Sequence, residues 1–560
     1  MGEDRKRIFI ISLDGATFDV INPLIAQGYM PNLGGLMKRS VSAELESVVP
    51  PVTAPAWSSF MTGKHPNKHG IFDFARFNPD RYNWTINTGR AIRSKTLWQI
   101  LSDKNKRVIV LNLPYTYPPY EINGIMVSGW DAPLDGSSFS YPPEASKDVL
   151  KMYPTYKDNL WISELQPLQS TKEFTELVCK LKTGFEQQAT IASHWMGKEQ
   201  WDVFMVHFQQ TDWIQHKIWT HIEKACKNAH DDTEEVKAAR SCYQQFDHCI
   251  GRLLQQVEPL QPVIILLSDH GFGRLMGNLN PNFYLKEWGY LSVKTGSEDG
   301  LNLFKKRFRN SESRIIRGLY RSVARASTGF ARTGTKKTHQ SWTDNAGDVL
   351  GKRGAMWDWG KTRAAVIYAY QMGFVFVNVV GRGPQGIVEP GKEYEMVIED
   401  LIARFKGLRH PQIREKVLMD VVRGSDIYPP ADAGTSVPDL VLVPVEGYGF
   451  SFSLSDAPPR ISDEGTHRKN GVLLVSGAGI GSPKAAFHPQ LIDVAPTILH
   501  LLGLAVPSDV DGRVLTEIIV SEDSPKYEEV DNQIVPAIND TPIESSLILE
   551  QRLRGLGYLE

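Results

Sequence analysis

The chain has 560 residues, of which 41% are hydrophobic, and its formal net charge at neutral pH is −2. A chain of this length buries a large core, so it forms either one α/β domain with insertions or two to three structural units, and a small disulfide-stabilised scaffold is excluded. Because the charges almost balance, no overall positive field favours binding to nucleic acid.

The cysteine pattern and the N-terminal sequence favour a soluble, cytoplasmic protein. The chain has four cysteines, and none of them forms a CxxC pair. The N-terminal apolar run is short and leads directly into Asp14, so it lacks the apolar region of a signal peptide. The longest uncharged stretch, 364–381, contains Tyr, Gln and Asn residues, and it predicts two strands that turn near 371–373 rather than a membrane span.

Short apolar runs alternate with helical patterns along the chain, which predicts an α/β protein with a mostly parallel sheet flanked by helices. The expected buried strands are 8–13, 108–113, 203–208, 263–267, 440–443 and 472–475. Helices are expected over 170–197, 234–257 and 492–504. The first of these helices opens with Ser170 and Thr171, which are favourable N-cap residues.

These patterns divide the chain into four parts. Residues 1–290 and 361–516 form the two parts of one core. Between them, 291–360 has few strand signals and is expected to be a basic insertion or cap, with eleven Lys and Arg against one Glu within 305–337. Residues 517–560 form a tail that is polar at first and ends in an amphipathic helix.

Polar side chains follow two of the predicted strands at the point where each strand ends. Asp14 follows the first strand, and Asp269 and His270 follow the strand 263–267. If both strands run parallel in one sheet, the three side chains share the edge where ligands bind in open α/β sheets. Asp14 taken alone is more simply explained as the cap of a turn before Gly15.

A second set of polar side chains involves Asp212, His216 and His467. Asp212 and His216 are four residues apart, so they share one face of a helix and can chelate one metal ion. A single pair of this kind is more often a solvated helix face. His467 is expected in a loop just before a strand, where Gly465 and Gly471 allow the backbone to bend towards a shared site.

Thr53 is the candidate nucleophile. It precedes Pro55 and a short helical run that ends at Thr62 and Gly63, which places its hydroxyl at a helix N-terminus. The simpler alternative is an N-cap with no further role. A hydroxyl group is a weak nucleophile unless a base or a metal ion lowers its pKa.

Together, three Asp, three His and one Thr suffice to hold two divalent ions. Two such ions can clamp the attacking and leaving oxygens of an in-line phosphoryl displacement. Mixed Asp and His ligands suit Zn²⁺, with Mn²⁺ and Mg²⁺ as alternatives.

The order of these motifs resembles the alkaline phosphatase superfamily, in particular its type I phosphodiesterase/nucleotide pyrophosphatase branch and the predicted phosphohydrolase/phosphomutase relatives. The resemblance rests on the seven residues above and on the segments TAPAW, MTGKHPNKHGIFDF, MPNLGGLM and IDVAPTILHLLGL, and it covers about 6–290 and 361–516. It implies an alkaline-phosphatase-like fold, and it implies that the two-part core carries the catalytic site.

The resemblance also implies a role for each residue. One ion would be held by Asp14, Thr53, Asp269 and His270, and the other by Asp212, His216 and His467. Thr53 would attack phosphorus and form a phospho-threonine intermediate, so that the protein would be a phosphodiesterase or phosphatase of small phosphoester substrates.

Some features depart from the family pattern and leave alternatives open. Ala54-Pro55-Ala56 stands where nucleotide pyrophosphatases have Phe-Pro-Asn. Thr53 and Trp57 stand at two positions where sulfatases have other residues, so the sequence does not favour a sulfatase. A phosphomutase or phosphotransferase using the same site, and a non-catalytic binding protein on the same fold, are the two alternatives. The sequence predicts no oligomeric state.

The basic insertion has three interpretations. It is a solvated loop, a lid whose arginines hold a polyanionic substrate, or a segment, 301–337, that contacts an acidic membrane surface. Trp357 and Trp359 near its end either line a pocket or pack the cap, and Asn282 is a candidate donor to a phosphoryl oxygen.

Overall fold

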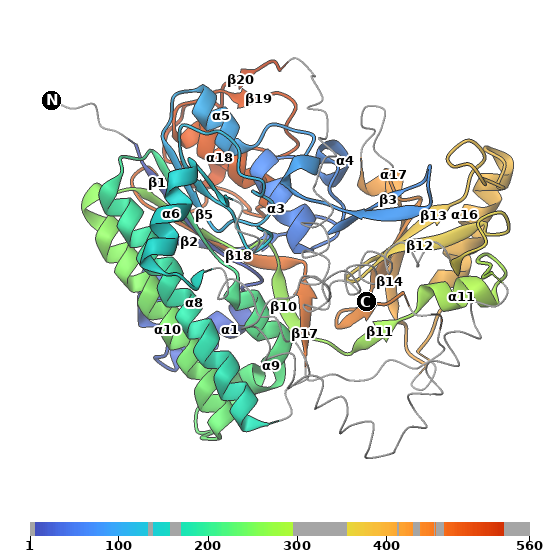
Figure 1. Cartoon of the computed structure of the whole chain (residues 1–560), viewed down its shortest axis with the longest axis horizontal. Helices are drawn as coiled ribbons and strands as arrows, with labels where there is room; N and C mark the ends of the chain where they lie inside the picture. The colour runs from blue at the N-terminus through green and yellow to red at the C-terminus, as the bar shows by residue number, and fades with distance from the viewer. Residues whose placement is uncertain are drawn as a thin grey trace, which may run out of the picture.

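Figure 1 shows a computed structural model of the chain. The structure describes residues 6–132, 138–156, 170–294, 356–410, 414–428, 437–452, 454 and 464–530. Within these ranges, eight strands form the main sheet in the order β2-β18-β9-β1-β8-β5-β6-β7. In chain order, their bounds are β1 Ile8–Leu13, β2 Val41–Glu46, β5 Val108–Leu111, β6 Gly124–Val127, β7 Ser140–Tyr141, β8 Val203–Phe208, β9 Val263–Leu267 and β18 Asn470–Ser476.

The five strands at the centre of this sheet run parallel. Strand β1 pairs in parallel with β8 on one side and β9 on the other, and β5 continues the parallel order towards β6. All six residues of β1 are buried, as are all six of β8, which is typical of strands covered on both faces. Because these strands are parallel, their carboxyl ends lie at one edge of the sheet.

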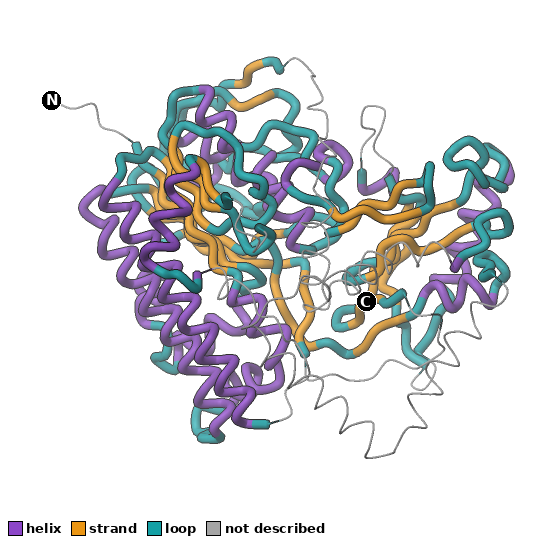
Figure 2. Tube along the Cα trace, viewed as in Figure 1, coloured by secondary structure: helices purple, strands orange, loops and turns teal. Residues whose placement is uncertain are grey.

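Helices cover both faces of the main sheet, as Figures 1 and 2 show. Long helices α8, α9 and α10 pack together with α1 and α2, whereas α3, α5 and α18 form the group on the other side. The helices are α1 Phe18–Ala26, α2 Pro31–Lys38, α3 Thr53–Thr62, α4 Pro66–His69, α5 Leu97–Asp103, α6 Pro143–Met152, α8 Thr171–Lys198, α9 Gln210–Lys227, α10 Glu234–Val257, α11 Pro281–Glu287, α16 Lys392–Lys406, α17 Gly424–Ile427 and α18 Val494–Leu501.

A second, four-stranded antiparallel sheet lies beside the main one, on the right of Figure 1. Its order is β12-β13-β15-β14, with bounds Ala364–Ala369, Gly373–Val377, Leu440–Pro444 and Leu418–Arg423. The strand predicted at 440–443 therefore exists, but it belongs to this sheet and not to the parallel one. Its apolar run gives no information on pairing partners, because a buried strand of either sheet has the same pattern.

Shorter ribbons connect the two sheets. Strand β10 pairs with β17 and β11 pairs with β16, and in Figure 1 the β10–β17 ribbon lies between the main sheet and the small sheet, whereas β11 lies below the small sheet. Their bounds, with those of two further pairs, are β10 Gly271–Arg274, β17 Gly465–Arg468, β11 Gly277–Leu279, β16 Tyr448–Phe450, β3 Ala75–Asn78, β4 Asn83–Ile86, β19 Val506–Pro507 and β20 Tyr527–Glu528.

The structure confirms the predicted α/β fold with a mostly parallel sheet, and most predicted elements appear where they were expected. Helix α8 begins after Ser170, whose hydroxyl accepts a hydrogen bond from the Glu173 backbone N–H. The helix predicted over 492–504 is shorter than expected, because Leu491–Asp493 form a 3₁₀ turn and α18 ends at Leu501. The two strands around 371–373 are β12 and β13.

Two further predictions concern the insertion and the tail. Trp357 and Trp359 are buried, and Trp359 stacks on Tyr82, so they pack the small sheet rather than line a pocket. The basic segment 301–337 and the predicted terminal helix lie outside the described residues. Among the described helices, none is both long enough and apolar enough to cross a bilayer.

Candidate metal and nucleophile site

The first group of polar side chains lies at the carboxyl edge of the main sheet. Asp14 follows β1, and Asp269 and His270 follow the neighbouring strand β9. The His270 Nε2 atom is 3.3 Å from Asp269 Oδ2 and 3.5 Å from Asp14 Oδ1. One ligand atom from each residue lies within 4.8 Å of the other two, and all three side chains are buried. This is a geometry that can hold one cation.

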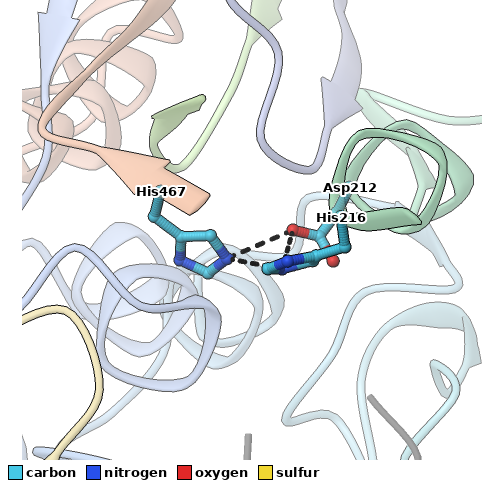
Figure 3. A group of neighbouring side chains, drawn as sticks. All are labelled: Asp212, His216 and His467. Carbon is cyan, nitrogen blue, oxygen red and sulfur yellow. Dashed lines mark hydrogen bonds and ion pairs between the residues drawn. The ribbon is translucent and has the colours of Figure 1, made fainter. Parts of the chain in front are cut away.

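The second group brings together Asp212, His216 and His467, which Figure 3 shows converging from a helix and a strand. Asp212 Oδ1 is 3.3 Å from both His216 Nε2 and His467 Nε2, and the two Nε2 atoms are 3.1 Å apart. His467 lies in strand β17 and not in the loop that the sequence predicted. Its segment forms a strand because it pairs with β10, which follows His270 in the sequence.

The two groups are neighbours. Through the β10–β17 pairing, the His270 and His467 rings stack with centroids 3.6 Å apart and an interplanar angle of 18°. The seven candidate residues therefore surround one small region, although they come from segments distributed between Asp14 and His467.

Each histidine of the two groups directs the same nitrogen atom at the centre. The Nδ1 atoms of His216, His270 and His467 are 3.2, 3.0 and 3.0 Å from the backbone carbonyl oxygens of Gly465, Gly271 and Pro51. A carbonyl oxygen only accepts hydrogen bonds, so each Nδ1 carries the proton. In the neutral form of such a ring, Nε2 presents a lone pair, which is the state that a metal ligand requires.

Thr53 is the first residue of α3, after the N-cap residue Val52. Its Oγ1 atom donates a hydrogen bond to Asp14 Oδ1 over 3.4 Å, and its side chain is completely buried. The hydroxyl therefore lies beside the first group and at the positive end of a helix, where an anion is stabilised.

Several contacts hold Asp14 in place. The Trp57 indole N–H donates to Asp14 Oδ2 over 2.9 Å, and Thr211 Oγ1 donates to the Asp14 carbonyl oxygen over 2.7 Å. On the other side, the Gly15 backbone N–H donates to Asp269 Oδ1 over 3.1 Å. These bonds leave Asp14 Oδ1 and Asp269 Oδ2 facing the His270 ring.

Burial and the charges nearby set the pKa values of the site. Burial, followed by the charges of Asp269 and Asp212, raises the pKa of Asp14 well above its ordinary 3.8. Burial likewise raises the pKa of Asp269. Burial lowers the pKa of His270 and, more moderately, that of His467.

The pKa of Asp212 shifts in the opposite direction. Burial by itself raises the pKa of its carboxyl, but the nearby His216 and His467 rings outweigh that effect, and the pKa lies well below 3.8. The second group therefore keeps one carboxylate ionised, whereas the first group crowds two carboxylates that repel each other. Both patterns suit a cation bound at each group.

Asn282 differs from the other candidates. Its amide N–H donates to the Val366 carbonyl oxygen over 3.0 Å, and its Oδ1 accepts from the Val366 backbone N–H over 2.8 Å. Both polar ends of the amide thus bind the backbone of β12, and the side chain is completely buried. Asn282 attaches α11 to the small sheet and takes no part in the site proposed below.

The sequence did not indicate two further residues at the site. Trp57 has a recognisable signal, because it lies one helical turn after Thr53 and therefore shares its face. Tyr370, in the turn after β12, has its hydroxyl oxygen 3.3 Å from His216 Nε2. Nothing in the local pattern places Tyr370 there, because the contact depends on how the small sheet packs.

The parallel sheet and the paired Asp and His groups at its edge define an alkaline-phosphatase-like α/β protein. The chain belongs to the type I phosphodiesterase/nucleotide pyrophosphatase family, whose model matches residues 8–472. This confirms the family expected from the motifs. No curated protein sequence matches the chain.

Solved structures agree with this fold. Phosphonoacetate hydrolase from Sinorhizobium meliloti 1021, in complex with phosphonoformate, matches with a TM-score of 0.53 and 15% identity over 89% of this chain and 95% of that one. The same protein in complex with phosphonoacetate gives the same values. Human ectonucleotide pyrophosphatase/phosphodiesterase 5 is also similar, with a TM-score of 0.48 and 12% identity over 92% of this chain and 100% of that one. At 15% identity, the likeness to phosphonoacetate hydrolase concerns the fold.

Proposed function

We propose that the protein is a metal-dependent phosphoryl-ester hydrolase, a phosphodiesterase or phosphatase of small substrates, with Thr53 as its nucleophile. One observation carries this proposal: the Thr53 hydroxyl lies beside two adjacent groups of Asp and His ligand atoms in a chain of the phosphodiesterase family. Each part of this combination occurs in proteins without such an activity, but their convergence on one buried region favours phosphoryl transfer.

The residues present fit a pair of divalent cations. Asp269 Oδ2 and His270 Nε2 are completely buried and have no hydrogen-bond partner among the described residues. In the second group, the two Nε2 atoms lie 3.1 Å apart and each is 3.3 Å from Asp212 Oδ1, so the three atoms are close enough to bind one cation. We assign one ion to Asp14, Thr53, Asp269 and His270, and the other to Asp212, His216 and His467.

Mixed carboxylate and imidazole ligands favour Zn²⁺, with Mn²⁺ and Mg²⁺ as alternatives. When bound, such ions lower the pKa of a hydroxyl group and neutralise the charge that develops on phosphoryl oxygens.

Thr53 supplies the oxygen that attacks phosphorus. Its hydroxyl proton is directed at Asp14 Oδ1, which can accept it as the Oγ1–phosphorus bond forms and the bond from phosphorus to the leaving oxygen breaks; that proton then balances the charge of the departing alkoxide, which leaves as the alcohol. The product is phospho-threonine at the N-terminus of α3, where the backbone N–H groups face the added negative charge. Water then attacks this phosphorus, releases phosphate or a phosphomonoester, and restores the Thr53 hydroxyl.

The test is the Thr53→Ala variant, assayed on an aryl phosphodiester with Zn²⁺ or Mn²⁺. We expect turnover to fall by at least about three orders of magnitude, because the nucleophile is lost. Metal content, measured by atomic emission, should stay near that of the wild type, because three ligands of the first group remain.

Two control variants make the result specific. Thr53→Ser keeps a hydroxyl and should retain measurable turnover. Thr62→Ala removes a buried threonine from the other end of α3, where its hydroxyl only donates to the Ser58 carbonyl oxygen, and should leave turnover near the wild-type value. Full activity of Thr53→Ala would exclude Thr53 as the nucleophile.

A further inference from the structure

The turn between β12 and β13 brings the small sheet into contact with the second group of ligands. Strand β12 ends at Ala369, and Tyr370 lies in the turn that leads to β13 at Gly373. The Phe450 backbone N–H donates to the Tyr370 carbonyl oxygen over 2.6 Å. Next to it, the buried Gln371 side chain hydrogen-bonds Thr466, the residue before His467. The turn is therefore attached to the strand that carries His467.

The Tyr370 hydroxyl lies on the side of His216 where the other ligand atoms lie. His216 Nε2 is 3.1 Å from His467 Nε2, 3.3 Å from Asp212 Oδ1 and 3.3 Å from the Tyr370 hydroxyl oxygen. Because Nδ1 of His216 already donates to the Gly465 carbonyl oxygen, only Nε2 faces the group. Tyr370 thus brings a fourth polar atom to a group of three.

The phenol ring is held in a defined orientation. It meets the His467 ring edge-on, with centroids 5.3 Å apart and an interplanar angle of 85°, and its centroid is 6.5 Å from that of His216. An aromatic side chain has few rotatable bonds, so these contacts and the clamped turn fix the hydroxyl with little loss of conformational entropy.

We propose that Tyr370 is a substrate-binding residue whose hydroxyl donates a hydrogen bond to a phosphoryl oxygen of the substrate. This inference rests on the proposed function, because it places a phosphoryl group between the two ligand groups. A phenol is neutral at neutral pH, and a neutral O–H donor suits an anionic oxygen. The residue comes from the small sheet, so that sheet supplies part of the phosphoryl site.

The alternative role for this hydroxyl is direct ligation of the ion at the second group. A hydrogen-bond donor to the substrate and a metal ligand differ in what their loss changes. Loss of the donor weakens anion binding and leaves metal binding intact, whereas loss of a ligand weakens metal binding first.

The test compares Tyr370→Phe with the wild type in two titrations that need no turnover. Isothermal titration of the metal-free proteins with Zn²⁺ gives the metal affinity, and titration of the metal-loaded proteins with inorganic phosphate gives the anion affinity. We expect phosphate to bind about 10-fold to 100-fold more weakly to Tyr370→Phe, which is the range for one hydrogen bond to a charged group. The Zn²⁺ affinity should change less than about twofold.

Tyr368→Phe is the matched control. Tyr368 lies on the same hairpin, but its hydroxyl accepts a hydrogen bond from the Phe77 backbone N–H. This variant should bind phosphate as the wild type does. Equal phosphate affinities for Tyr370→Phe and the wild type, weaker Zn²⁺ binding with phosphate affinity retained, or no phosphate binding by either protein would each overturn the inference.

Failure of the proposed function would be seen separately. Phosphate and Zn²⁺ binding are measured at equilibrium, so they report on Tyr370 whether or not Thr53 attacks phosphorus. A wild-type protein that binds both but turns over no phosphoester would contradict the hydrolase proposal and leave the assignment of Tyr370 intact.

Discussion

The two carboxylate oxygens of Asp14 have different partners and therefore different roles. Trp57 Nε1–H binds Oδ2, and the remaining oxygen, Oδ1, faces Thr53 and His270. Trp57 and Thr53 are one helical turn apart on α3, so the helix that carries the candidate nucleophile also orients this ligand. The indole makes no direct contact with the reacting atoms in this arrangement and is a positioning residue.

In the wild-type protein, the Trp57 and His207 rings meet edge-on with centroids 5.0 Å apart. Replacing Trp57 by Phe removes the N–H group but keeps an aromatic ring beside His207. We expect Zn²⁺ affinity, measured by calorimetric titration, to fall about tenfold, because the partner that orients a metal ligand is lost. The comparison is Trp98→Phe. Trp98 is also fully buried, but its indole N–H has no hydrogen-bond partner among the described residues. If both variants bind Zn²⁺ equally well, Trp57 does not position Asp14.

At the scale of elements, the β10–β17 ribbon joins the two ligand groups. His270 precedes β10, and His467 lies in β17 opposite Phe272. The ribbon packs closely at Gly271, where an added Cβ atom would lie 1.9 Å from the Asn470 carbonyl oxygen. A side chain at this position must therefore push the β10 backbone away from the segment that follows His467.

The Gly271→Ala variant tests this role of the ribbon. We expect the free energy of unfolding to fall by about 1–3 kcal/mol, because the methyl group overpacks against the backbone, and the number of bound Zn²⁺ ions to fall as the two groups separate. Denaturant unfolding and metal analysis give the two quantities.

Gly35 provides the contrast. It is exposed on α2, and an added Cβ atom meets nothing within 4 Å. Gly35→Ala should therefore raise the free energy of unfolding by about 0.5–1 kcal/mol. Unchanged metal binding in Gly271→Ala would show that the ribbon tolerates the displacement.

For the whole molecule, bound cations would connect segments that are far apart in the sequence. The ligand atoms come from the ends of β1 and β9, from α9 and from β17. Without a cation, Asp14 and Asp269 have pKa values in the folded protein that lie above the unfolded value near 3.8. The two carboxyl groups therefore contribute most to stability below the unfolded pKa, and this contribution is lost as the pH rises through the folded pKa. A bound cation requires both carboxylates to be ionised, so its stabilising effect changes with pH in the opposite direction.

We therefore expect saturating Zn²⁺ to raise the Tm, and EDTA to reverse the change. At about 100 times the dissociation constant, the stabilisation is about 2.7 kcal/mol. At one fixed Zn²⁺ concentration, the rise in Tm should be larger at about pH 8 than at about pH 5, because protons compete for Asp14 and Asp269 as the pH falls and raise the dissociation constant. Thermal unfolding followed by circular dichroism gives these values. A rise in Tm that is independent of pH would contradict ligation by these two carboxylates.

The sequence by itself determined the central strands β1, β5, β8 and β9 of the main sheet, together with β18 and the identity of the candidate ligands, but it gave no sign of β2, β6 or β7. Apolar runs such as 203–208 have a period and length that specify buried strands, and the polar residues at their ends stand out because a buried Asp or His needs a partner. The helical spacing of Asp212 and His216 is equally local, since i and i+4 residues share a helix face wherever the helix lies.

Only the tertiary structure decided which of these local features meet. The strand at 440–443 pairs in the small sheet, His467 lies in a ribbon instead of a loop, and Asn282 binds the β12 backbone instead of the site. Tyr370 reaches His216 through the packing of one sheet against another. Strand pairing and sheet packing depend on contacts between distant segments, and no local pattern of apolar and polar residues carries that information.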